Sequence, residues 1–168
     1  AQTIDLAPTV LDFFAIESPE DMQGRRLLER MLEDEPAREA GLYGVMGGQV
    51  NVTDGRYVYM RAPVTEDNAP LFEYTLMPAH MNSMFSTSEL ERWERVSGFS
   101  FMKGCQVMQI PSRTARPFLS PDNPMGRARL ATLLFDVRAD PGQLHPIDDP
   151  LIEVRMIRLM LLEMARNE

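Results

Sequence analysis

Few residues of this chain could act as nucleophiles, bases or metal ligands. It contains two histidines, His80 and His145, and one cysteine, Cys105. A His-based triad or a His-rich metal site would therefore use nearly all of the available histidines. A cysteine nucleophile needs a nearby base or a setting that favours the thiolate, and the neighbours at 106–108, Gln-Val-Met, offer neither. We expect Cys105 to be a buried structural thiol.

Three side chains of one proline-rich stretch are candidate contacts to a substrate. Residues 63–131 form a loop-rich, proline-rich insert that contains His80, Lys103, which is the only lysine, and Arg113. Long irregular segments are poor core and commonly form the rims of pockets, so we predict these three as substrate-pocket residues. The ordinary alternative is that Lys103 and Arg113 are solvated and that His80 satisfies a local backbone group.

The acidic residues predict no cofactor or metal site. Asp148 and Asp149 stand where a helix needs a cap, and residues 33–35 lie in a solvated turn. The glycine-rich phosphate-binding, nucleophile-elbow and HExxH motifs are also missing from the sequence. Spacing alone therefore identifies no catalytic residue.

The elements that must position these residues begin with two short helices. Asp5 is expected to cap a helix over 6–15 with Pro8 in its first turn, and a second helix is predicted over 25–32. Residues 41–62 predict an antiparallel meander, because Asp54-Gly55 separates two β-rich runs. Its core-facing side chains are expected to be Val50, Val52, Tyr57 and Tyr59.

The second half predicts further strands and a terminal helix. Strands are expected at 72–77, 99–102, 105–110 and 132–137, with a helix over 87–96 that starts at a Ser86–Glu89 capping box. A helix capped by Asp149 with Pro150 at its first position runs to about 165. The predicted fold class is α+β: a small antiparallel sheet of about four strands packed against the C-terminal helix, with short N-terminal helices and a loop-rich insert over 63–131.

Composition limits the partners. The 168 residues are 44% hydrophobic and 25% charged, as in a folded domain, with a net charge of −8. That sign opposes binding to nucleic-acid phosphates. The sequence has no apolar run long enough to cross a bilayer, and its start has no basic or apolar leader region. We expect a soluble chain without nucleic-acid or membrane partners and without a targeting signal in this segment; it begins without Met, as a piece of a longer protein would.

Four ordered segments resemble the end of the sulfatase family of the alkaline-phosphatase superfamily. Residues 5–12 with Gln23-Gly24 look like the family's D-x-x-P-T-x-x-D helix and Q-G element. Residues 54–59 are similar to its D-G-R-Y-K-Y strand, with Val58 in place of lysine. Residues 134–137 and 140–143 look like its L-Y/F-D-L strand and D-P-x-E turn, with Gln143 in place of glutamate. The resemblance covers both ends of the chain, and residues 63–131 match less clearly.

The family's catalytic parts have no counterpart here. Its signature is C-x-P-S-R or S-x-P-S-R, whose first residue becomes formylglycine. This chain has Pro111-Ser112-Arg113, but Cys105 lies six residues before Pro111. The family's calcium-binding aspartates and D-H-G segment precede the D-x-x-P-T helix, and so would lie before Ala1. The resemblance implies calcium and formylglycine for the full-length parent and none in this chain.

The resemblance implies a C-terminal, non-catalytic part of a sulfuric ester hydrolase that acts on sulfated carbohydrate. Residues 1–40 would end the catalytic domain, and residues 41–168 would form a subdomain that packs on it and lines the substrate pocket. The alternative is an independent binding module for a sulfated or acidic glycan. A severed part should expose apolar side chains at Leu6, Val10, Phe13 and Phe14, and it is expected to form a homodimer through residues 1–32. A free module should instead present an aromatic or Arg-rich cleft.

Overall fold

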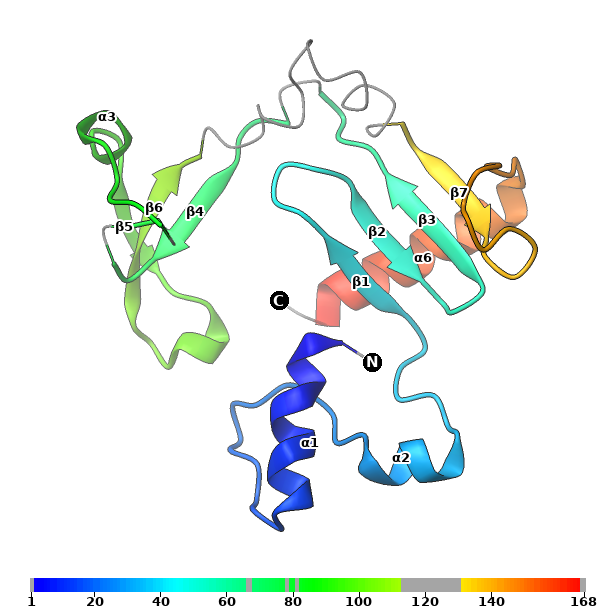
Figure 1. The fold of residues 1–168 in the computed structure, drawn as a ribbon. Helices are drawn as coiled ribbons and strands as arrows, with labels where there is room; N and C mark the ends of the chain where they lie inside the picture. The colour runs from blue at the N-terminus through cyan, green and yellow to red at the C-terminus, as the bar shows by residue number, and fades with distance from the viewer. Residues whose placement is uncertain (1, 66–67, 78, 81, 113–130, 167–168) are drawn as a thin grey trace.

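The fold is α+β, as predicted. The computed structural model describes residues 2–65, 68–77, 79–80, 82–112 and 131–166 (Figure 1). Within these ranges the α-helices are α1 (Leu6–Phe13), α2 (Leu28–Glu33), α3 (Thr87–Leu90) and α6 (Pro150–Arg166), with 3-10 helices η1 (Thr3–Asp5) and η2 (Ser100–Met102). None of the helices in the described ranges is long and apolar enough to span a membrane.

The predicted meander forms most of a four-stranded antiparallel sheet. Its strands are β1 (Gly41–Gly44), β2 (Val50–Thr53), β3 (Tyr57–Arg61) and β7 (Leu133–Asp136), in the order β1-β2-β3-β7. The Asp54-Gly55 turn joins β2 to β3 as expected. Gly55 has φ +88°, and Asp54 Oδ1 accepts hydrogen bonds from the N–H groups of Arg56 and Tyr57 at 2.9 and 2.7 Å.

The core lies between this sheet and α6, which crosses one of its faces (Figure 1). Val52 and Tyr59 are paired in register, share that face and are fully buried. Val50 is the exception among the predicted core residues, because it pairs with Arg61 at the end of the ladder and is exposed. The predicted start of α6 is confirmed, since Asp149 Oδ1 accepts hydrogen bonds from the first N–H groups of the helix.

The insert contains a second sheet that sequence patterns indicated only in part. Three antiparallel strands, β4 (Phe72–Thr75), β5 (Glu94–Ser97) and β6 (Gln106–Pro111), pair in the order β4-β6-β5. The predicted strands at 72–77 and 105–110 correspond to β4 and β6. The helix predicted over 87–96 ends at Leu90, because residues 94–97 pair with β6 instead, a long-range contact that local periodicity does not report.

The strand predicted at 99–102 is wrong. Residues 100–102 form η2, and Lys103 follows with φ +54° in the left-handed region. The Gly98 N–H donates to the Cys105 carbonyl at 3.2 Å, so the segment closes the β5–β6 hairpin as a tight loop. Aromatic residues favour strands, but here the closing turn of the hairpin determines the backbone conformation.

A buried carboxylate organises the N-terminal segment, in a way that differs from its predicted role. Asp5 makes no side-chain capping bond to α1 and is fully buried. It accepts hydrogen bonds from the N–H groups of Gln2 and Arg25 at 2.8 and 2.9 Å, and from the Arg38 guanidinium. Burial opposes ionisation, but the Arg38 guanidinium and the two backbone donors outweigh it and hold the Asp5 pKa well below its usual range.

These contacts fix which side of α1 faces the rest of the chain. Pro8 is fully buried, and Thr9 Oγ1 accepts a hydrogen bond from the Leu27 N–H at 3.1 Å. Together with Asp5 these residues are spaced by three and four, so they share one face of the helix. The inward face of α1 thus carries small side chains, and the larger apolar side chains Leu6, Val10 and Phe13 are exposed to solvent.

Asp5→Asn is expected to destabilise the N-terminal segment by about 3 kcal/mol, because it leaves the Arg38 charge without its partner. Urea denaturation followed through the amide NMR signals of α1 measures the loss. Because the Asp5 pKa is lowered in the folded state, its ionised side chain contributes fully to the free energy of unfolding above about pH 4, and this contribution is lost as the pH falls below that value. The stability of the variant should therefore change less between neutral and acidic pH than that of the wild type. Asp12→Asn, which removes an exposed bond to Arg26, is the control. Equal stability of Asp5→Asn and wild type would contradict this role.

Candidate functional site

His80 lies between two carboxylates, and the structure thereby gives this predicted pocket residue specific partners. Its Nδ1 is 3.2 Å from Glu73 Oε2, and its Nε2 is 2.9 Å from Glu89 Oε1. The ring lies 4.2 Å from the Phe85 ring, centroid to centroid. β4 supplies Glu73 and α3 supplies Glu89, so the imidazole joins a strand of the three-stranded sheet to the helix that contacts β6.

Hydrogen bonds hold both carboxylates in place. The Ser86 hydroxyl and N–H donate to Glu89 Oε2 at 2.6 and 2.7 Å, and these donors, with His80, lower the Glu89 pKa to about 2. The Ser86–Glu89 capping box was predicted from the sequence and is confirmed. The Ser112 hydroxyl donates to Glu73 Oε1 at 2.9 Å. Because Ser112 donates to a carboxylate and not to the imidazole, the cluster is not a serine–histidine nucleophile pair.

A small cavity of about 160 Å³ adjoins this cluster. Its lining residues are Ser88, Glu89, Arg92, Pro111 and Ser112. Arg92 brings a guanidinium beside two hydroxyls, which suits a small oxyanion, and the Glu89 carboxylate on the same wall opposes one. The cavity therefore supports binding or positioning of a polar group more readily than catalysis.

Lys103, the second predicted pocket residue, does not join His80. Lys103 lies at the opposite end of β6, where its Nζ is 2.9 Å from Asp21 Oδ2, and its side chain is 70% exposed. This position agrees with the alternative that Lys103 is solvated, although it also forms an ion pair with Asp21. Arg113 lies outside the described residues.

The structure adds an aromatic cluster that was not predicted. Tyr74, Phe99 and Phe101 are 41, 46 and 50% exposed. Phe99 lies edge-on to Tyr74 at 5.0 Å and is stacked on Phe101 at 5.5 Å. Tyr74 points away from the face that carries Glu73, because neighbouring strand residues alternate. The Phe-x-Phe pattern beside the turn at Gly104 is the available signal, although its local β propensity predicts a strand.

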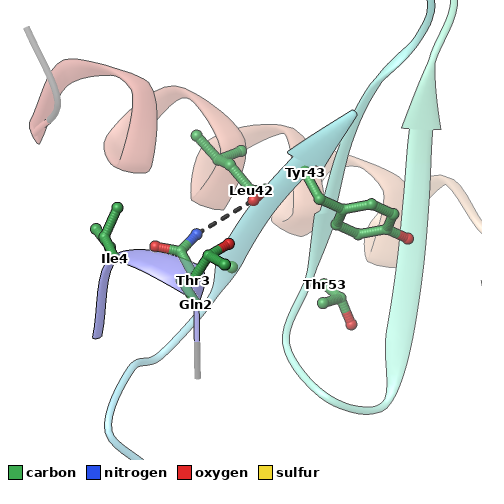
Figure 2. A pocket seen from close by; sticks show the side chains of 7 residues that line it. Gln2, Thr3, Ile4, Leu42, Tyr43 and Thr53 are labelled. Carbon is green, nitrogen blue, oxygen red and sulfur yellow. Dashed lines mark hydrogen bonds between the residues drawn. The ribbon is translucent and has the colours of Figure 1, made fainter. Parts of the chain in front are cut away.

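A second, open cavity of about 480 Å³ lies between η1 and β1. Figure 2 shows its lining, Gln2, Thr3, Ile4, Gly41, Leu42, Tyr43 and Thr53. The Gln2 side-chain amide donates to the Leu42 carbonyl at 3.1 Å, and partial loss of solvent around the exposed Tyr43 ring raises the pKa of its hydroxyl. The lining contains no charged side chain, so it offers neither a general base nor a metal ligand.

Within the described ranges, no group of three or more His, Cys, Asp or Glu residues could hold a metal ion. Cys105 is exposed, which corrects its expected burial. It follows Gly104 in the hairpin loop, where the chain turns at the surface. His145 is also at the surface, beside Asp140 at 3.6 Å.

Neither the protein-family models nor the curated proteins gave a match to this chain.

Two substitutions of Lys103 distinguish the contribution of its charge to stability from the cost of its left-handed backbone conformation. Lys103→Ala is expected to leave the urea midpoint nearly unchanged, because an exposed ion pair contributes little. Lys103→Gly should be more stable than Lys103→Ala by about 1 kcal/mol, since glycine removes the cost of the left-handed conformation. A large loss of stability in both variants would show that the lysine side chain holds the hairpin to the N-terminal segment.

Proposed function

We propose that this chain is the C-terminal, non-catalytic region of a sulfatase, a sulfuric ester hydrolase that acts on sulfated carbohydrate. Residues 1–40 end the catalytic domain, and residues 41–168 form the subdomain that packs on it. The nucleophile, as formylglycine, and calcium belong to the upstream part of the parent. The ordered sequence segments support this proposal, and so does the surface of α1.

The observation that carries the proposal is the outward face of α1. Leu6 and Val10 are 60 and 55% exposed, and Phe13 and Phe14 are 69 and 65% exposed. Such a face costs about 25 cal/mol for each Å² of apolar area in contact with water. A contiguous apolar patch of this kind is typical of a surface that another domain covers.

Exposed apolar side chains also occur on α2, which contacts α1. Met31 and Leu32 are also exposed, and α2 has no buried residue. A helix of six residues has little stability of its own in water, so its packing partner matters. In the parent, the catalytic domain supplies that partner. Without it, the same surface joins two copies of the chain through residues 1–32.

Complementation tests the proposal directly. The upstream catalytic region, produced separately, is expected to bind this chain and to regain aryl-sulfate turnover in calcium, while the chain alone gives none. Phe13→Glu with Phe14→Glu should abolish the complex, because two charges would be buried at the interface. Leu144→Glu, at an equally exposed apolar residue, should leave it intact. Turnover by the chain alone, or no complex with the wild-type chain, would contradict the proposal.

The aromatic cluster favours the alternative, a binding module for a sulfated or acidic glycan. Tyr74, Phe99 and Phe101 present ring faces and edges to solvent on one side of the three-stranded sheet. Gln109, which is paired with Tyr74, adds a side-chain amide on the same face. Flat apolar rings beside an amide can contact a sugar ring and its hydroxyls.

For this alternative, Phe99→Ala should weaken binding of a sulfated disaccharide at least about tenfold in calorimetric titration. Tyr43→Ala, which removes an exposed ring from the other sheet, is the matched control. The desulfated disaccharide distinguishes ring stacking from recognition of the sulfate. If the wild-type chain binds neither sugar, or if Phe99→Ala binds as the wild type does, the module reading is wrong.

A further inference from the structure

The position of His80 between two carboxylates makes its contacts depend on the protonation of its ring. A carboxylate only accepts hydrogen bonds, so a ring nitrogen that bonds to a carboxylate must carry a proton. Both His80 nitrogens lie within 3.2 Å of carboxylate oxygens. The imidazolium form is the one that matches both contacts, because it carries an N–H at each nitrogen and a positive charge between the two carboxylates.

The charged groups that face the ring come from two elements. Among the described residues, the charged groups placed against His80 are Glu73 from β4 and Glu89 from α3. Phe85, on its other side, is uncharged. Glu89 is anionic throughout this range because its pKa is lowered to about 2. Histidine side chains, in contrast, commonly titrate between about pH 5 and 8.

We propose that His80 is a pH-dependent latch that fastens residues 82–90 to the three-stranded sheet when its ring is protonated and releases them when the ring is neutral. A neutral imidazole keeps one N–H and presents a lone pair at its other nitrogen. One of the two carboxylates then faces that lone pair, and an attractive contact becomes repulsive. The latch is closed on the acidic side and opens as the pH rises.

Opening changes what the sheet presents to solvent. The segment is anchored by an antiparallel bridge between Ala79 and Met84 and by the contacts of α3 with β6. Phe85 is buried, and Ile110 lies opposite Glu73 on the latch side of the sheet and is only 1% exposed. Release of the segment uncovers this apolar face and removes Ser88 and Glu89 from the wall that they share with Arg92 and Ser112. The device is independent of the proposed sulfatase role.

Hydrogen exchange at two pH values tests the latch. The amides of residues 86–90 and 108–110 should be at least about tenfold better protected at about pH 5.5 than at about pH 8.5, after correction for intrinsic exchange. Nitrogen-15 NMR should show both His80 nitrogens protonated at the lower pH. The assignment is simple because His145 is the only other histidine, and His145→Gln should keep the wild-type pH dependence.

Two variants separate the latch from a merely structural histidine. His80→Gln should lose the difference between the two pH values, with the low protection of the open form at both. Glu73→Gln should stay protected at both pH values, because its side-chain NH₂ donates to the neutral ring while its oxygen still accepts from Ser112. Equal protection of the wild type at both pH values would overturn the proposal, as would a Glu73→Gln variant that opens at the higher pH.

Discussion

The buried carboxylate of Asp5 is the constraint on which the N-terminal half of the structure depends. It draws together the start of the chain at Gln2, the loop at Arg25 and the approach to the sheet at Arg38. A buried charge requires this complete set of donors, so the helix that follows cannot rotate about its axis. The orientation of α1 and the exposure of its apolar side chains are thus consequences of one ionised group. The family resemblance gives that exposed face a proposed occupant, the catalytic domain.

The polar cluster and the aromatic cluster lie on opposite faces of the three-stranded sheet. One face carries Glu73 and Ile110 beneath the segment that contains His80. The other face carries Tyr74 with its neighbouring phenylalanines. The insert is therefore a folded unit with a polar cluster on one side and exposed rings on the other. The proposed sugar contact uses the face with the aromatic rings, and the proposed pH response uses the face with His80.

Sequence patterns predicted the elements whose causes are local. The Asp54-Gly55 turn and the Asp149-Pro150 helix start depend on backbone preferences of adjacent residues, and both are confirmed. Asp5 also looked like a local cap, but its strongest partner, Arg38, is 33 residues away. The Glu73, His80 and Glu89 cluster exists only because β4 and α3 meet on β6. No spacing rule reports such a meeting, which explains why His80 was predicted as a contact residue without its partners.

The central claim is that the outward face of α1 is covered in the full protein, and a labelling rate tests it most directly. Phe13→Cys, made together with Cys105→Ser because the native thiol is exposed, places one reactive thiol on that face. The account predicts rapid modification in this chain and modification slower by at least about tenfold once the upstream catalytic region is attached. Equal rates in the two proteins would contradict it.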